Sequence, residues 1–258
     1  MRVIRQPSVY LVGRQVLNEA DLSRFLADHN VTGWSTDTDI AAQVLPEVAG
    51  RVCYMSFAKP RPGGNKTYLE HIKEVGHGSV LEHSIFNFII TGVSRSFTHE
   101  LVRHRAGFGY SQLSQRYVDE SVADFVEPDC IGDDPELHRV WQAAVDECQK
   151  AYVQLVEGLQ AKFAQVEDKT LRRKLARQAA RSVLPNATET KIFVTANARA
   201  WRHFIELRCN EHAETEIRIV AAQVCEILQR EAPNLFGDYE LHKLPDGTRA
   251  ARTQFHKV

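Results

Sequence analysis

The sequence predicts an α/β or α+β protein, and three observations support that class. Apolar residues make up 43% of the 258 residues and charged residues 25%, the balance of an ordinary soluble globular protein. Several long stretches have helical periodicity, and a few short stretches between them alternate as strands do. A chain of this length can bury a sizeable core without cross-links. We therefore expect a single domain over residues 1–258.

The first half of the chain shows both periods. Residues 37–57 carry apolar side chains near helical spacing, and Pro46 within them should kink or split that helix. Residues 83–93 are rich in Ile and Phe, and the alternation through Phe86 and Phe88 predicts a strand. The other elements expected here are, in chain order, a strand at 9–12 and helices at 21–28, 67–75 and 94–103.

Proline and glycine mark the irregular segments. Two prolines and a Gly-Gly pair predict a loop at 59–65, and a second irregular stretch runs from 121 to 135. The tail after Pro233 mixes Gly, Pro, Asp and Lys and is expected at the surface. The remaining elements are, in chain order, the start of a strand at Tyr117, helices at 137–163 and 169–183, a strand at 191–195, and helices at 198–208 and 213–231.

Charge and cysteine usage narrow the class of protein. The net charge is -1, whereas a dedicated nucleic-acid binder usually carries a basic excess. The five cysteines are widely spaced and form no C-x-x-C pair, which argues against a disulfide framework and a zinc ribbon and favours a reducing cytoplasm. No apolar stretch approaches the ~18 residues of a membrane span, and no signal peptide is evident. We expect a cytoplasmic protein without membrane or nucleic-acid partners.

Three polar clusters carry the candidate chemistry. In the first, Arg103-His104-Arg105 ends a helix, and a Gly-containing segment with Ser, Gln and Tyr follows, which suits phosphates and pyrimidine edges. In the second, Arg177 and Arg181 share a helix face that can bind an anion. The third runs from Asn197 to His212. Each has a plain alternative: a helix end with a polar loop, a solvated charged face, and an interior helix with satisfied polar groups.

Two familiar kinds of site are not indicated. His99 and His104 resemble a zinc-protease pair but are five residues apart, which places them about 140° apart around a helix. The neighbouring arginines would also repel a dication. No G-x-G-x-x-G or Walker A motif occurs. We therefore expect no metal site, no Rossmann site and no P-loop.

With these clusters assembled, the sequence resembles the flavin-dependent thymidylate synthases. The signature of that family is Arg-His-Arg, a spacer of seven or eight residues, and Ser-x-Arg. Here the same order is Arg103-His104-Arg105, eight residues, and Ser114-Gln115-Arg116. The spacer is the longer form, with the extra residue at Ala106-Gly107. The resemblance extends over most of the chain and includes residues 77–83, 98–101, 184–190 and 201–204.

The resemblance implies a fold of long helices packed on a small mixed sheet and a homotetramer with its sites at subunit interfaces. It implies reductive methylation of C5 of dUMP to dTMP, with FAD as cofactor, methylenetetrahydrofolate as carbon donor and NADPH as reductant. Turning a methylene into a methyl group requires a hydride, which a flavin can supply and an amino-acid side chain cannot.

The resemblance also implies roles for individual residues. Arg208 is expected to be catalytic, because a fixed cation at the uracil edge would stabilise negative charge on N3 and O2. Ser114 is grouped with it in a positioning role, since no general base is evident in the sequence. The residues expected at FAD are His77, Ser79, Glu82, Arg103, His104, Arg105, Asn197, Arg199 and His203. Those expected at dUMP are Glu100, Arg103, Gln112, Ser114, Gln115, Arg116, Arg181 and Arg208.

Two alternatives stay open at this point. The same chemistry could act on the ribonucleotide UMP, as in nucleoside-antibiotic biosynthesis, because one 2′-hydroxyl separates the two substrates. The longer spacer at Ala106-Gly107 motivates that alternative. The other is a non-catalytic protein that binds RNA or another polyanion through residues 172–181, although the near-neutral charge weighs against it.

Overall fold

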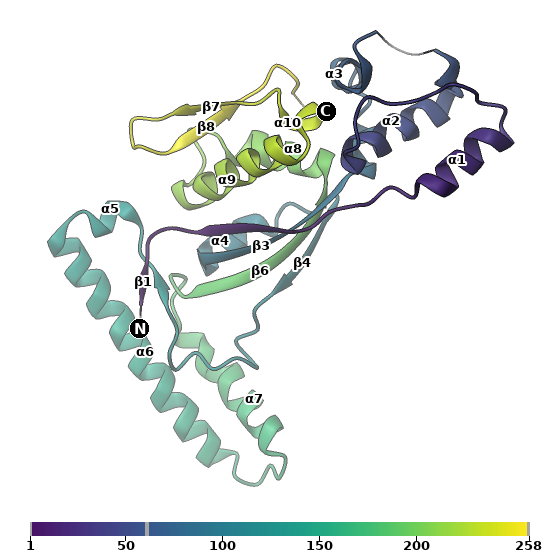
Figure 1. The fold of residues 1–258 in the computed structure, drawn as a ribbon. Helices are drawn as coiled ribbons and strands as arrows, with labels where there is room; N and C mark the ends of the chain where they lie inside the picture. Colours follow the sequence, from purple (N-terminus) through teal and green to yellow (C-terminus); the bar gives the residue numbers. More distant parts are fainter. Residues whose placement is uncertain (1, 60–61, 257–258) are drawn as a thin grey trace. The chain divides into compact units, whose positions relative to one another are not determined.

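The computed structural model describes residues 2–59 and 62–256 (Figure 1). The chain divides into two compact units, each built from three separate segments. The first unit holds 2–8, Ile90–Arg103 and Ser111–Phe193, and the second holds Val9–Ile89, His104–Tyr110 and 194–256. The expectation of one domain over the whole chain stays a prediction.

The fold class is confirmed as mixed α/β. A four-stranded sheet has the order β2-β3-β6-β4, with β2 at Ser8–Gly13, β3 at Ile85–Ser94, β6 at Glu189–Asn197 and β4 at Phe108–Gln112. Each of these strands begins in one unit and ends in the other. Two short pairs complete the strands: β1 (Val3–Ile4) runs parallel to β5 (Phe125–Val126), and β7 (Glu240–Lys243) runs antiparallel to β8 (Arg249–Arg252).

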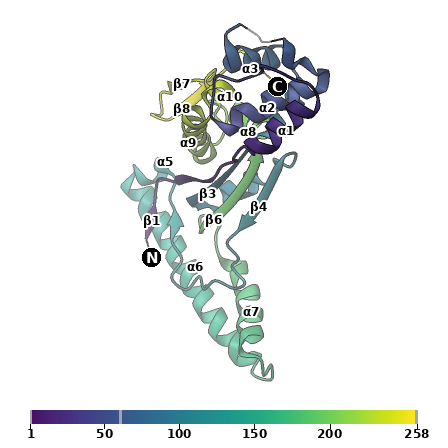
Figure 2. The same ribbon diagram turned by 45° about the vertical axis from the view of Figure 1, so that its right-hand side comes forward.

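The first unit is built on two helices that lie side by side in both views (Figures 1 and 2). The Asp134 side chain caps α6 by accepting from two backbone N–H groups, and Asp168 caps α7 in the same way. Phe125 on β5 is fully buried in a cluster with Val145 on α6, and this contact anchors α6 to β5. The helices of this unit are α4 (Arg95–Leu101), α5 (Asp129–Gly132), α6 (Pro135–Lys162), α7 (Lys169–Ala180) and the 3-10 turn η3 (Arg181–Val183).

The second unit has an aromatic core around Trp201. Its indole lies edge-on to the rings of Phe88 and Phe108, with centroids 5.0 Å and 5.2 Å away, and it also packs against Phe204. These contacts bury α8 against strands β3 and β4. The helices are α1 (Glu19–Asp28), α2 (Ala41–Tyr54), η1 (Ser56–Ala58), α3 (Gly64–Glu74), η2 (Gly78–His83), α8 (Ala198–Arg208), α9 (Thr215–Glu231) and α10 (Pro233–Phe236).

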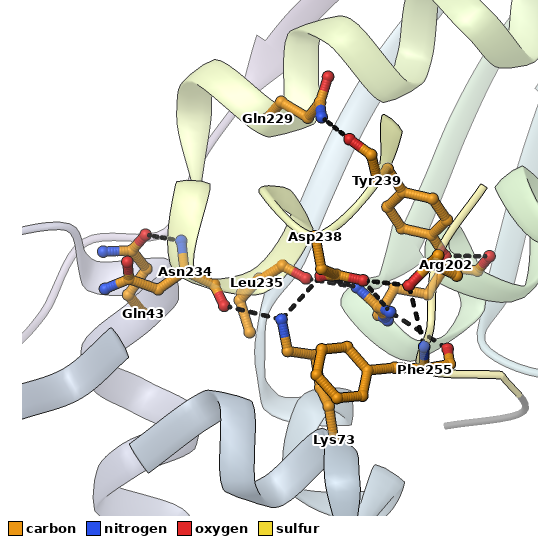
Figure 3. Close-up of polar contacts among 10 residues, drawn as sticks. Gln43, Lys73, Arg202, Gln229, Asn234, Leu235, Asp238, Tyr239 and Phe255 are labelled. Atoms are coloured by element: carbon orange, nitrogen blue, oxygen red, sulfur yellow. Dashed lines mark hydrogen bonds and ion pairs between the residues drawn. The ribbon is translucent and has the colours of Figure 1, made fainter. Parts of the chain in front are cut away.

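A buried ion network ties α3 and α8 to the C-terminal part of the second unit (Figure 3). Arg202 donates to both carboxylate oxygens of Asp238 at 2.8 Å, and Lys73 donates to Oδ1 at 2.7 Å. Burial alone would raise the pKa of Asp238. The hydrogen bonds and charges of Arg202 and Lys73 outweigh burial and hold that pKa at about 2.

Most predicted helices and strands are confirmed, with ends within a few residues of those expected, and two expectations are wrong. The helix at α2 is continuous through Pro46, so the expected split does not occur, and the alternative of a kink at Pro46 stays a prediction. Tyr117 lies in a turn, and the strand of that region is β4. The tail after Pro233 is not merely surface, because it forms α10 and the β7–β8 hairpin and buries Leu235 and Phe236. The loop expected at 59–65 falls partly on 60–61, which lie outside the described residues.

Candidate functional site

A basic pocket of about 230 Å³ lies in the first unit. Arg95 begins α4, and the Ser94 side chain caps that helix by accepting from the Phe97 N–H at 3.1 Å. His99 follows Arg95 by four residues and so shares its helix face. The lining residues are Arg95, His99, Gln115, Arg181, Leu184, Pro185 and Asn186.

The arginines of this region suit an anion. The Nε atoms of Arg95 and Arg116 are buried and have no hydrogen-bond partner among the described residues. Burial lowers the pKa of Arg95; the Glu120 carboxylate opposes that shift and the Arg181 charge adds to it. A dianionic phosphate would satisfy the buried donors and offset the repulsion between Arg95 and Arg181.

The end of the Arg-His-Arg signature, Ser114-Gln115-Arg116, forms a tight turn beside this pocket. The Ser114 carbonyl oxygen accepts from the N–H groups of Tyr117 at 3.2 Å and Val118 at 3.0 Å. The Ser114 hydroxyl accepts from the Arg116 N–H at 3.4 Å. Gln115 is buried and lines the pocket. The turn therefore places two of the predicted nucleotide residues, Gln115 and Arg116, by backbone geometry.

Three other predicted nucleotide residues also lie in the first unit. The Gln112 amide donates to Thr98 Oγ1 at 3.0 Å and to Thr190 Oγ1 at 3.3 Å, so it bridges α4 and β6. Glu100 lies near the end of α4, and its carbonyl oxygen accepts from the exposed Arg103 at 3.2 Å. None of these three lines the cavity.

In the second unit, His104 and Arg208 are in direct contact. Arg208 Nε donates to His104 Nε2 at 3.0 Å. The His104 ring is 7% exposed and packs edge-on to Phe204, with centroids 5.3 Å apart, and 6.0 Å from the ring of His203. Tyr110 donates to the His104 carbonyl oxygen at 2.6 Å. The second residue of the signature is thus a buried acceptor for the arginine expected at the uracil.

Gly107, in the longer spacer, has a backbone conformation that requires glycine. Its φ is +75°, and an added Cβ would lie 2.8 Å from Asn197 Nδ2 and 2.9 Å from the Ala200 Cβ. The Asn197 side chain caps α8 by accepting from the Ala200 N–H at 2.8 Å. The glycine therefore lets the spacer pass close to the capped start of α8.

The remaining predicted cofactor residues are exposed. Arg199 on α8 forms an ion pair with Glu82 on η2, with Nη1 and Oε1 2.6 Å apart. The other four are His77, Ser79, Arg105 and His203. Exposed cations and donors of this kind can reach a pyrophosphate, so the residues present fit a flavin nucleotide.

The structure separates the predicted residues by unit. Those expected at the nucleotide lie in the first unit, except Arg208, and those expected at the flavin lie in the second, except Arg103. Five residues lining the basic pocket were not predicted there: the polar residues Arg95, His99 and Asn186 and the apolar residues Leu184 and Pro185. The spacing of Arg95 and His99 along one helix face is the signal that could have indicated them.

The basic run at 172–181 does not form one solvated face. Arg172 donates to the Ala164 carbonyl oxygen at 3.3 Å, and Arg177 donates to the Tyr117 carbonyl oxygen at 2.7 Å. Arg181 lines the basic pocket. These arginines bind within the unit, which weakens the case for a polyanion-binding surface.

Two other kinds of feature are not found in the part of the chain that the structure describes. Within residues 2–59 and 62–256, no three His, Cys, Asp or Glu side chains come close enough together to hold a metal ion. None of the helices described is both long enough and apolar enough to cross a membrane.

Comparisons with known proteins agree on one family. The family model described as thymidylate synthase complementing protein matches residues 37–234. The flavin-dependent thymidylate synthase of Mycolicibacterium gilvum (strain PYR-GCK) is 56% identical over 220 residues, covering 84% of this chain and 87% of that protein. That of Mycobacterium avium (strain 104) is 53% identical over 229 residues, covering 88% and 90%.

A solved structure has a similar fold. It is a UMP/dUMP methylase, PolB, from Streptomyces cacaoi, bound with 5-Br dUMP. The TM-score is 0.68 over 92% of this chain and 96% of that chain, at 19% sequence identity. At that identity the likeness supports the fold.

Proposed function

Since the chain belongs to the flavin-dependent thymidylate synthase family, we propose that it converts dUMP to dTMP with FAD as cofactor, methylenetetrahydrofolate as carbon donor and NADPH as reductant. The observation that carries the proposal is the basic pocket beside the Ser114-Gln115-Arg116 turn, where the buried Nε atoms of Arg95 and Arg116 have no hydrogen-bond partner within residues 2–59 and 62–256. Family membership sets aside the non-catalytic alternative.

In this proposal the first unit binds the nucleotide phosphate. Arg95, Arg116 and Arg181 provide the charge, and each guanidinium can donate two parallel hydrogen bonds to phosphate oxygens. Gln115 is buried at the pocket and supplies a neutral donor. The arginines thus fix the position of the nucleotide phosphate. Binding of the phosphate then helps to orient the rest of the nucleotide for reaction.

Arg208 is the residue we assign to the uracil. Transfer of a one-carbon unit to C5 requires C5 to act as a nucleophile, and negative charge developing on N3 and O2 activates C5 for that role. The Arg208 cation stabilises that charge, and its hydrogen bond to His104 holds the guanidinium in one orientation. When bound, the flavin supplies the hydride that reduces the transferred methylene to methyl.

Ser114 is a positioning residue in this scheme. Its hydroxyl accepts from the Arg116 N–H, and no imidazole or carboxylate among the described residues is hydrogen-bonded to it. A serine without a base is a weak nucleophile. We therefore assign Ser114 to the shape of the turn and to the phosphate.

The function is tested by tritium release from C5-labelled dUMP and C5-labelled UMP with FAD, NADPH and methylenetetrahydrofolate. We expect release from dUMP and formation of dTMP. Flavin-loaded protein that releases tritium from neither nucleotide would overturn the proposal. Equal or greater release from UMP would move the substrate to the ribonucleotide. Omitting NADPH or the folate, one at a time, tests each co-substrate.

A further inference from the structure

Arg177 holds the nucleotide-binding turn without lining the pocket. It lies on α7, one turn before Arg181. Its Nη1 donates to the Tyr117 carbonyl oxygen at 2.7 Å, and its Nη2 donates to Asp119 Oδ2 at 2.7 Å. The Arg177 side chain is 16% exposed and the Asp119 side chain 47% exposed, so the arginine is largely covered while its carboxylate partner faces water.

Hydrogen bonds within the turn link the Tyr117 carbonyl to the residues beside the pocket. Tyr117 and Val118 donate their N–H groups to the Ser114 carbonyl oxygen, so the Tyr117 peptide cannot move without Ser114. The Arg116 N–H is bound to the Ser114 hydroxyl within the same turn. A displacement of the Tyr117 carbonyl would therefore displace the residues assigned to the nucleotide phosphate.

The other end of this contact is also fixed. Asp119 Oδ1 accepts from the Ser121 N–H at 3.0 Å, which orients the carboxylate toward Arg177. Directly after it, the Glu120 N–H donates to Tyr152 Oη at 3.4 Å, and Gln149 donates to the Glu120 carbonyl oxygen at 2.6 Å. The turn is thus bound to both α6 and α7. From α7, Arg177 binds the Tyr117 carbonyl and Asp119, and the Lys174 ammonium lies 5.0 Å from the centroid of the Tyr117 ring.

We propose that Arg177 is a positioning residue that holds the Ser114-Gln115-Arg116 turn in its nucleotide-binding geometry, an inference that rests on the proposed function. The planar fork of Arg177 holds a carbonyl and a carboxylate on two separate nitrogens, in a fixed geometry that the single nitrogen of a lysine does not reproduce. Without it the turn must be ordered when the nucleotide binds, and that ordering weakens affinity. Once the nucleotide is bound, the chemical step is unchanged.

The test compares Arg177→Ala and Arg177→Lys with Arg173→Ala. Arg173 is exposed and lies one turn earlier on α7, and within the described part of the chain it makes no hydrogen bond or ion pair with the turn. Its replacement by alanine therefore removes the same charge without removing a contact to the turn. We expect Arg177→Ala to raise the KM and the dissociation constant for dUMP about tenfold, with kcat changed less than about threefold and flavin content unchanged. Arg177→Lys should fall between, and Arg173→Ala should stay within about twofold of wild type.

The outcomes separate this inference from the function it rests on. Wild-type protein that fails to bind dUMP contradicts the proposed function. Wild-type protein that binds dUMP while Arg177→Ala binds it equally well contradicts the inference, and so does an equal loss in Arg173→Ala, which would indicate charge alone. If Arg177→Ala does not fold, Asp119→Ala removes the exposed partner instead and should raise the KM several-fold. An unchanged KM in that variant would overturn the proposal.

Discussion

The hydrogen bond between Arg208 and His104 fixes a proton on the imidazole. Arg208 Nε is always a donor, so His104 Nε2 must be the acceptor, and a neutral ring then carries its hydrogen on Nδ1. The ring is buried against Phe204, which restricts its rotation. One signature residue therefore orients the cation that we assign to the uracil edge.

The Arg208→Ala variant tests that assignment. We expect flavin to stay bound and kcat to fall about 100-fold or more, the usual cost of removing a group that stabilises developing charge. Flavin absorbance of the purified variant and steady-state rates measure the two effects. Leu207→Ala, a neighbouring exposed position on α8, serves as the control and should retain activity. Loss of flavin in Arg208→Ala would instead assign Arg208 to the cofactor.

Gly107 provides a second test at single-residue scale. In Gly107→Ala the new Cβ meets Asn197 and Ala200 at less than 3.0 Å, and the positive φ adds strain. We expect a loss of about 1–3 kcal/mol in unfolding free energy. Gly158→Ala on α6 is the matched control, because nothing lies within 4 Å of its Cβ and helix propensity should make it neutral or stabilising. Equal thermal melting of the two variants would contradict the clash.

At the scale of elements, Asp238 joins α3 and α8 to the C-terminal strands. Folding depresses the pKa of this carboxyl from an ordinary 3.8 to about 2. A depressed carboxyl contributes its full stability above its unfolded pKa and loses it as the pH falls through the folded one. Stability from Asp238, about 2 kcal/mol, is therefore present above about pH 4 and lost toward pH 2.

The Asp238→Asn variant should lose about 3–5 kcal/mol at pH 7, because Lys73 and Arg202 remain buried without their counter-charge. Urea unfolding at pH 7 and pH 3 measures this loss, and the variant should lack the part of the acid dependence that belongs to Asp238. Glu240→Gln removes an exposed carboxylate two residues further along the chain, at the start of β7, and should match wild type. A wild-type pH profile in Asp238→Asn would disprove the linkage.

At the scale of elements, the helices were predictable from the sequence because each amphipathic pattern extends over many residues. The bounds of α8 match the prediction, and α6 differs by two residues at its start and one at its end. Strand β4 was missed because Gly109 and the polar residues around it resemble a loop, although Phe108 and Tyr110 alternate in burial. The β7–β8 hairpin was missed because its strands are short and polar. Their pairing with each other and the packing of β8 against α9 are not evident in the local sequence.

The candidate site was predictable where its residues share a motif. The Arg-His-Arg and Ser-x-Arg residues are adjacent in sequence, so a resemblance could identify them. Arg95 and His99 belong to a pocket that tertiary structure assembles from α4, the signature turn and residues 181–186. No local sequence pattern predicts such an assembly. The contact from Arg177 to the Tyr117 carbonyl likewise depends on tertiary structure and could not be predicted from a local pattern.

At the scale of the whole molecule, the homotetramer stays a prediction, and helix α6 carries exposed apolar side chains on which such an association could rest. Over its 28 residues only Val145 and Tyr152 are buried, while Leu137, Val140 and Leu155 are exposed. Exposed apolar side chains along one helix are typical of a surface that another chain covers.

We predict that flavin retention depends on that association. Val140→Glu should shift the protein toward monomers and lower its flavin content, because charge is excluded from an apolar interface. Sedimentation velocity with detection at the flavin absorbance measures both at once. Arg139→Ala, at the neighbouring exposed position, should remain assembled. A monomer that retains stoichiometric flavin would contradict the prediction.

The division of each unit into three segments has a consequence for synthesis on the ribosome. Phe88 is made early, yet its partner Trp201 follows more than a hundred residues later. At roughly 5–20 residues per second, the nascent chain keeps this strand uncovered for roughly 5–20 s. The first unit has all its segments by Phe193, whereas the second waits for residues beyond 250. Strand β3 therefore emerges in the first half of synthesis but is covered by α8 only in the second half, and during that interval a chaperone could bind it.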